Sequence, residues 1–259
     1  MDANKPKSDL EIRALVGVAA AIVALAGLAL GGFAWWAFVG LVALAALWEW
    51  TTLAGCGAGR STVAAAALAL IIALASPLGW GPERDSVAML ALAGILVAMV
   101  IGNTRAGWGL LYAGLPAIAL LFLRAIPNGV AFALWTLLVV ILTDTGAYFA
   151  GRAIGGPKLS PRLSPNKTWA GLVGGMIAAG IGGAIVAVVF RLPAPLLWLG
   201  APLAVAAQAG DLYESALKRA AGVKDSGRLL PGHGGVLDRI DGLVPVATIM
   251  GALVAGGAM

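Results

Sequence analysis

The amino-acid sequence predicts an all-α, polytopic integral membrane protein with about nine transmembrane helices. Hydrophobic residues make up 61% of the chain and charged residues 11%, whereas soluble domains average roughly 45–50% and about 25%. The apolar residues form long runs, and a helix needs ~20 mostly apolar residues to cross about 30 Å of hydrocarbon. The basic residues lie mainly in short segments between these runs. These observations leave no room for a water-soluble domain of useful size.

The nine predicted helices follow the apolar runs in chain order, and the fifth, eighth and ninth runs are short. Their residues are 14–30, 33–53, 62–78, 86–102, 108–123, 129–150, 168–190, 195–210 and 242–258. The first five runs lie in residues 1–128, where we expect a mostly apolar scaffold. The other runs lie in residues 129–259 with nearly all the candidate functional residues, so we expect the catalytic site there.

The distribution of Lys and Arg predicts the orientation of the chain, because basic residues collect in the cytoplasmic segments of membrane proteins. If the N-terminus is cytoplasmic and nine helices follow, only Arg84, Arg124 and Arg191 of the 17 basic residues fall outside. Removing one early helix would place the main polar segments on the wrong side. The sequence therefore predicts that these segments face the cytoplasm.

The N-terminal segment also resembles a secretory signal. Lys5, Lys7 and Arg13 precede an apolar run in which Ala24-Leu-Ala26 could serve as a cleavage site. The same basic flank also orients an uncleaved helix, and the chain continues to cross the membrane afterwards. We therefore expect an uncleaved first helix.

Two features of the early helices stand out from their apolar background. Glu49 is an acid near the predicted cytoplasmic end of the second run, where it can reach the interface, so we expect a structural role. Glycine is abundant, and Gly27-x3-Gly31 and Gly171-x3-Gly175 have a spacing that lets helices approach closely in lipid. Such spacings also arise by chance. We expect an oligomer, most simply a homodimer.

Asp144 lies inside the sixth apolar run. A charged Asp at the bilayer centre costs roughly 2.5–3.5 kcal/mol on insertion scales, so something must bind it. Neighbouring hydroxyls could cap this carboxylate, but we favour a functional role.

The segment that follows cannot be a continuous helix, because it is rich in proline and glycine. Its four basic residues could simply hold it against anionic lipid head groups. Alternatively, Ser164, Lys167 and Thr168 at the start of the seventh helix could form an anion site with the free N–H groups there.

The main candidate site is a polar stretch near the C-terminal end. Asp211, Ser215 and Lys218 recur at i, i+4 and i+7, so they share one helix face. Asp238 and Asp241 are spaced i and i+3 and should face the same way at the start of the ninth helix. Aspartates that bind a divalent cation, beside Lys and Arg that bind phosphate oxygens, suit a polyanionic substrate.

This stretch resembles the signature of a known family. It reads Ser215-x-Leu217-Lys218-Arg219-x4-Lys224-Asp225-x-Gly227-x2-Leu230-Pro231-x-His233-Gly234-Gly235-Val236-x-Asp238-Arg239-Ile240-Asp241. It is similar to the signature of the phosphatidate cytidylyltransferases (CDP-diacylglycerol synthases), as is the stretch Asp144-Thr-Gly-Ala-Tyr-Phe149. The family also has a Ser-Pro-x-Lys-Thr like the one beginning at Ser164. Ala170 stands where the family usually has Glu, which removes any acidic role at that position.

The resemblance implies transfer of the cytidylyl group from CTP to phosphatidic acid, giving CDP-diacylglycerol and pyrophosphate. It implies Mg²⁺ as cofactor, alone or with a second ion, and membrane lipid rather than nucleic acid as partner. The location implied is a bacterial inner membrane with the active site facing the cytoplasm.

The resemblance also assigns roles to individual residues. The expected metal ligands are Asp211, Asp238 and Asp241, which form the catalytic set together with Lys218 and Arg239. The residues expected to contact CTP or the lipid are Asp144, Ser164, Lys167, Thr168, Ser215, Arg219, Lys224 and His233. His233 is the only histidine, which excludes a multi-histidine metal site and favours a contact to phosphate or nucleotide.

Two other functions were weighed against this one. A CDP-alcohol phosphotransferase would need an Asp-Gly-x2-Ala-Arg motif followed by two further spaced aspartates, which the chain lacks. A cation transporter would usually show internal repeats with polar sites in both halves. Here the apolar runs of the first half contain almost no polar residues, and the acids of the candidate site gather at one predicted cytoplasmic face, so we favour the cytidylyltransferase.

Overall fold

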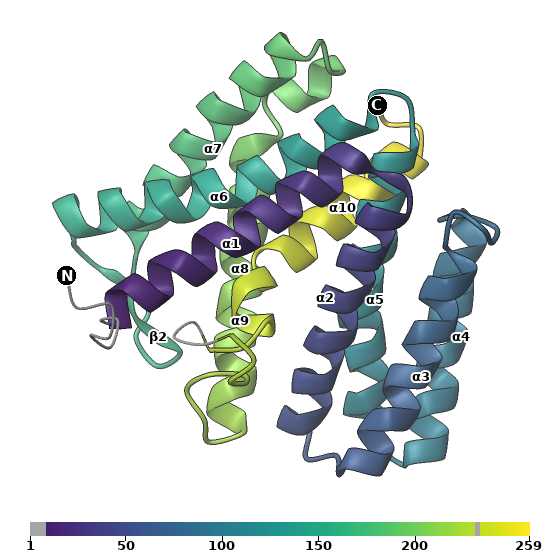
Figure 1. Cartoon of the computed structure of the whole chain (residues 1–259). Helices are drawn as coiled ribbons and strands as arrows, with labels where there is room; N and C mark the ends of the chain where they lie inside the picture. The colour runs from purple at the N-terminus through teal and green to yellow at the C-terminus, as the bar shows by residue number, and fades with distance from the viewer. Residues whose placement is uncertain (1–8, 231–233) are drawn as a thin grey trace, which may run out of the picture.

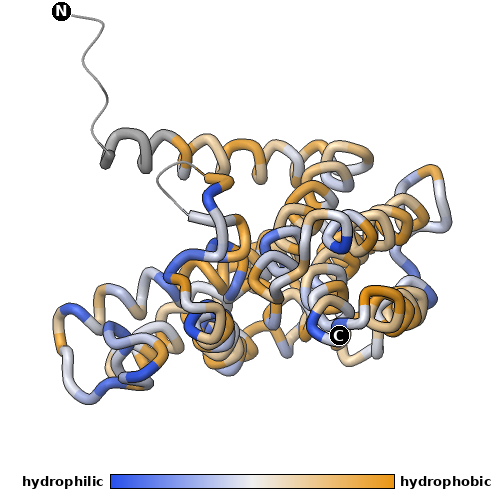
Figure 2. Tube along the Cα trace, turned by 90° about the horizontal axis from the view of Figure 1, so that it is seen from below, coloured by the Kyte–Doolittle hydropathy of each residue, from blue (hydrophilic) through white to orange (hydrophobic). Residues whose placement is uncertain are grey.

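The computed structural model describes residues 9–230 and 234–259, and these residues are almost entirely helical. The elements are α1 (Asp9–Leu30), α2 (Gly32–Leu53), α3 (Ala58–Leu74), α4 (Arg84–Ile101), α5 (Thr104–Ala125), α6 (Gly129–Ile154), β1 (Lys158–Ser160), β2 (Ser164–Thr168), α7 (Trp169–Val189), the 3-10 helix η1 (Ala194–Leu197), α8 (Gly200–Ala220), α9 (Leu237–Ile240) and α10 (Leu243–Ala255). Orange colour runs along most helical turns in Figure 2, and deep blue is limited to short stretches.

The helices form two groups that meet in the middle of the molecule (Figure 1). Helices α2 to α5 pack side by side, and α6 packs along α7. Helix α10 joins the groups, since it contacts α5 on one side and α6 and α8 on the other. Helix α8 packs on α7 and continues into the region of α9, so the polar stretch lies where the two groups meet.

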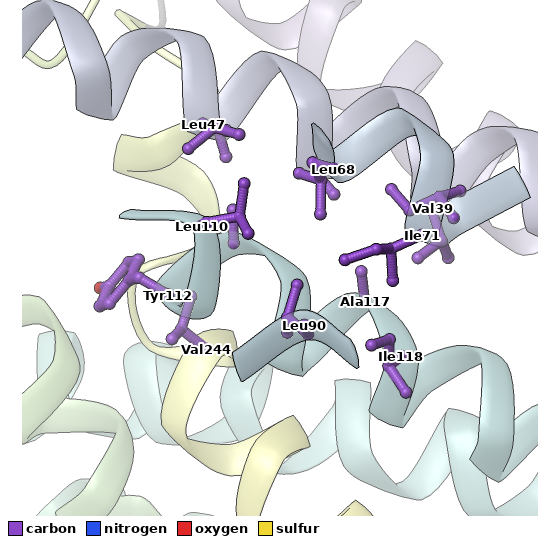
Figure 3. Packing of buried hydrophobic residues seen from close by; sticks show 14 of the residues in the cluster. Val39, Leu47, Leu68, Ile71, Leu90, Leu110, Tyr112, Ala117, Ile118 and Val244 are labelled. Carbon is purple, nitrogen blue, oxygen red and sulfur yellow. The ribbon is translucent and has the colours of Figure 1, made fainter. Parts of the chain in front are cut away.

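The core of the first group is aliphatic. Figure 3 shows Leu47, Leu68, Leu90 and Leu110 converging from α2, α3, α4 and α5, each almost fully buried. Val244 of α10 belongs to the same cluster. The apolar scaffold is therefore packed directly against the helix that follows the candidate site.

Helices α6 and α7 approach closely because small residues line their contact. A Cβ added to Gly174 would collide with Ala150, and one added to Gly175 would lie 2.8 Å from the carbonyl oxygen of Thr143. In the same way, Gly27 packs against Trp35 and Phe38 of α2. The two glycine spacings noted in the sequence thus contact neighbouring helices within the chain.

The all-α membrane fold is confirmed, and nine helices of the described residues match the nine predicted runs. Four of them, α2, α5, α6 and α7, are long and apolar enough to cross a membrane by length and composition, and α1, α3, α4 and α10 contain shorter apolar segments. The number of crossings stays a prediction.

One local expectation was wrong, and one element was not predicted. The eighth helix begins at Gly200 instead of residue 195, because the proline-containing segment before it forms η1. It then continues without a break to Ala220, past the end of the apolar run at residue 210, which confirms that Asp211, Ser215 and Lys218 lie on one helix. The loop after α6 forms a small antiparallel sheet in which Ser160 pairs with Ser164. Short-range backbone pairing of this kind leaves little trace in hydropathy.

The orientation can be tested with a reporter fused after α10. The sorting of basic residues predicts that this end lies outside the cytoplasm. Alkaline phosphatase fused there should therefore be active and green fluorescent protein dark, with the opposite pattern for fusions in the loop after α8. A reporter after α10 that is active only in the cytoplasm would contradict nine crossings.

Candidate active site

A polar cavity of about 660 Å³ lies between α6, the β2 strand, α7 and α8. Asp144 reaches it from α6, Lys167 from β2, and Gln208 and Asp211 from α8. Ser164 and Thr168 also line it. The cavity thus collects residues from the three polar segments that the sequence singled out, although they lie far apart along the chain.

Lys167 is the central cation of this cavity. Its ammonium forms an ion pair with Asp211 and donates a hydrogen bond of 2.8 Å to Oε1 of Gln208. Gln208 is buried and was not predicted, although it lies one helical turn before Asp211. Since Lys167 follows the turn of the β-hairpin, the hairpin holds this cation over α8.

Asp241 lies near the same group of acids, between α9 and α10. Burial, assisted by the nearby charge of Asp211, raises the pKa of the Asp241 carboxyl to about 7. Asp144 repels it further, and Lys167 opposes this repulsion. Three carboxyl groups therefore face one region that holds a single close ammonium.

A second cluster surrounds Lys218 on α8. Its Nζ lies 2.6 Å from Oδ1 of Asp238 and 2.5 Å from Oε2 of Glu214. Oδ2 of Asp238 accepts hydrogen bonds from the backbone N–H groups of Ser226, at 3.0 Å, and Gly235, at 2.8 Å. Glu214 is fully buried and was given no role from the sequence.

The charge of Asp238 is stabilised by this environment. Burial alone would raise its pKa. Interactions with Glu214 and Lys218, together with the hydrogen bonds from the two backbone N–H groups, outweigh burial and hold the pKa of Asp238 well below the ordinary value of an aspartate. Asp238 is therefore ionised at neutral pH.

Asp238 and Asp241 lie where the chain passes from α9 to α10, with helical backbone angles at Asp241 and Gly242, and their expected common direction stays a prediction. Asp238 lies in the short helix α9, and Asp241 follows its last residue, before α10 begins. Asp241 accepts a hydrogen bond of 2.8 Å from the N–H of Gly242. The two carboxylates have different neighbours, since Asp238 contacts Lys218 and Asp241 lies near Asp211.

The remaining predicted residues have varied surroundings. The Thr168 hydroxyl caps α7 by accepting a hydrogen bond of 3.0 Å from the N–H of Gly171. Ser215 is half-buried on α8. Arg219 and Lys224 are exposed, and Arg219 donates to the carbonyl of Val223 at 3.4 Å.

His233 lies outside the described residues. Arg239, exposed on α9, lines an apolar groove. The substrate-binding and catalytic roles that the sequence predicts for Thr168, Ser215, Arg219, Lys224, His233 and Arg239 all stay predictions.

The oxygen ligands of Asp144, Asp211 and Asp241 are of the kind that Mg²⁺ prefers. Their mutual repulsion is the kind of strain that a divalent cation relieves, so the donor set fits the predicted cofactor. Among residues 9–230 and 234–259, no group of three His, Cys, Asp or Glu side chains is close enough together to hold a metal ion as it stands. The predicted grouping of Asp211, Asp238 and Asp241 around one ion stays a prediction.

Comparison with known proteins covers nearly the whole chain. Residues 11–255 match the Cytidylyltransferase family. A phosphatidate cytidylyltransferase of Brucella suis is 40% identical over 254 residues, which is 94% of this chain and 92% of that protein. Those of Staphylococcus haemolyticus and Pseudomonas aeruginosa are 36% and 40% identical, over 94% and 87% of this chain and 98% and 92% of their own lengths.

These matches extend the resemblance from the polar segments to the apolar helices before them. They confirm the prediction of a nucleotidyltransferase. The chain belongs to the cytidylyltransferase family.

Proposed function

We propose that this protein is a phosphatidate cytidylyltransferase. A phosphate oxygen of phosphatidic acid attacks the α-phosphorus of CTP and forms a new P–O bond. The bond between that phosphorus and the oxygen bridging to the β-phosphate breaks, and pyrophosphate leaves with the electron pair. The observation that carries the proposal is a polar cavity lined by Asp144, Lys167 and Asp211, in a protein that also has an apolar groove lined by Arg239.

The apolar groove has a volume of about 530 Å³ and is lined by α1, α2, α5 and α10. Arg239 is the one charged residue among the lining residues that the structure describes. Arg239 also interacts electrostatically with Asp144, which lines the polar cavity. A lipid with its acyl chains in the groove would hold its phosphate beside Arg239, and the electrostatic interaction of Arg239 with Asp144 links this position to the cavity suited to a nucleotide.

The chemistry needs little acid–base help from the protein. A phosphate monoester is already an anion near neutral pH, so no residue must remove a proton to make the nucleophile. The protein must bring two polyanions together, and Lys167, Lys218 and Arg239 supply positive charge for this purpose. Mg²⁺ bound by the aspartates would neutralise phosphate charge and stabilise the pyrophosphate leaving group.

The proposal includes a location and an assembly. Several apolar helices make this a membrane protein, and the relatives named above are bacterial. We propose the bacterial inner membrane, with the polar cavity open to the cytoplasm, where CTP is available. A homodimer is part of the proposal as well, with CTP and phosphatidic acid as the substrates of each copy.

The purified protein in detergent should release pyrophosphate only when CTP, phosphatidic acid and Mg²⁺ are all present. EDTA should stop the reaction, and CDP-diacylglycerol should accumulate in equal amount. Three results would contradict the proposal. Release of CMP from CDP-diacylglycerol with an alcohol would indicate a phosphotransferase. Release of pyrophosphate from CTP without lipid would indicate a hydrolase. If no combination of substrates released pyrophosphate, the result would favour a transporter.

A further inference from the structure

Glu49 is a buried acid in α2, within the apolar scaffold, yet its carboxylate contacts the C-terminal polar stretch. Only 6% of the residue is exposed. Oε1 accepts a hydrogen bond of 3.0 Å from the N–H of Val236, and Oε2 accepts one of 2.8 Å from the N–H of Leu237. The Ser226 hydroxyl lies 2.9 Å from Oε2. Each of these three partners belongs to the segment that leads into α9.

The segment depends on these bonds because it has little secondary structure of its own. Buried N–H groups need acceptors, and those of Val236 and Leu237 begin α9 where no helical carbonyl precedes them. Two glycines allow the carboxylate to approach. A Cβ on Gly227 or on Gly235 would collide with the carboxylate oxygens of Glu49. The polar segment is thus shaped around this one side chain.

The same segment also holds Asp238. The Ser226 hydroxyl lies between the two acids, 2.9 Å from Oε2 of Glu49 and 3.0 Å from Oδ2 of Asp238. The N–H groups of Ser226 and Gly235 bind Asp238, while those of Val236 and Leu237 bind Glu49. Displacing Glu49 would therefore disturb the donors that orient Asp238 toward Lys218.

We propose that Glu49 is a positioning residue: it holds Ser226 and the residues 235–237 so that Asp238 and Lys218 keep their places for the reaction. Glu49 acts through this segment and does not itself bind a substrate. The inference rests on the proposed cytidylyltransferase activity, because the loss is expected in that turnover. It also gives the N-terminal half a specific part in forming the site.

Glu49→Gln is the sharpest test, because it conserves shape and replaces one acceptor oxygen by an NH₂ donor. That donor would face a backbone N–H, so at least one of the two bonds must break. Amide hydrogens of Val236 and Leu237 should exchange at least about tenfold faster, because local opening becomes easier. The kcat should fall by roughly 10–100-fold, since a small misplacement of reacting groups has effects of this size. The KM for phosphatidic acid should change little.

Glu83→Gln is the matched control, because Glu83 is exposed before α4 and its side chain makes no capping hydrogen bond. It should leave both exchange and kcat at wild-type values. If Glu49→Gln does not reach the membrane, Ser226→Ala removes only the hydroxyl link and should give a smaller fall in kcat with the same pattern.

The inference is overturned if membrane-inserted Glu49→Gln keeps wild-type kcat, or if Val236 and Leu237 exchange at wild-type rates. It is also overturned if neither Glu49→Gln nor Ser226→Ala changes kcat. Failure of the proposed function looks different: the wild-type protein would make no CDP-diacylglycerol. The exchange measurement would still show whether Glu49 holds the segment.

Discussion

Asp238→Asn should lower turnover by about two to three orders of magnitude, because it removes a charge and disrupts a saturated set of hydrogen bonds. Oδ1 binds the ammonium of Lys218, and Oδ2 accepts the backbone N–H groups of Ser226 and Gly235. The amide of Asn has one acceptor oxygen and one donor group. In either orientation of the Asn side chain, its NH₂ group faces another donor, which is either the ammonium of Lys218 or the N–H groups of Ser226 and Gly235.

The measurement is kcat for CDP-diacylglycerol formation at equal amounts of membrane-inserted protein. Asp85→Asn is a suitable control, since Asp85 is exposed at the start of α4. A Mg²⁺ titration of Asp238→Asn would also test the predicted role of Asp238 as a metal ligand. Near-normal turnover in Asp238→Asn would reject any essential role for this carboxylate.

Asp211→Asn should lower kcat by about 100-fold or more and raise the Mg²⁺ concentration needed for half-maximal activity. The change removes the ion-pair partner of Lys167. It also removes one of three carboxylates that face the same region, the others being Asp144 and Asp241. A cation bound by the remaining two would be held more weakly.

Tyr213→Phe provides a control on the same helix. The Tyr213 hydroxyl contacts the indole nitrogen of Trp108 at 2.9 Å, and Tyr213 does not line the polar cavity. Its loss should leave the Mg²⁺ dependence unchanged. If Asp211→Asn had the same Mg²⁺ dependence as the wild-type protein, Asp211 would not be a ligand.

Much of the fold could be predicted because hydropathy is a local property of the chain. In lipid there is no water to bind the backbone N–H and C=O groups, so each apolar run must satisfy them with hydrogen bonds within its own helix. The existence of α2, α6 and α7 therefore follows from composition over some twenty residues. The start of α8 did not follow, because hydropathy does not distinguish the 3-10 helix at Ala194–Leu197 from a regular α-helix.

The residue types of the site could also be predicted, together with the segments that hold them. Asp211, Lys218 and Asp238 stood out because a charged side chain in a membrane protein costs free energy to bury and is therefore usually kept for a functional role. Their partners did not follow from spacing. Lys167 binds Asp211 only because the β-hairpin places it over α8.

The sequence by itself determined that this is an all-α membrane protein with its polar chemistry in the C-terminal half, because both features depend on residues close together in the chain. Only the tertiary structure decided which polar groups meet. The contact between Glu49 and Leu237 spans 188 positions, and the one between Lys167 and Gln208 spans 41. Such contacts depend on how whole helices pack, and no local pattern of residues encodes that packing.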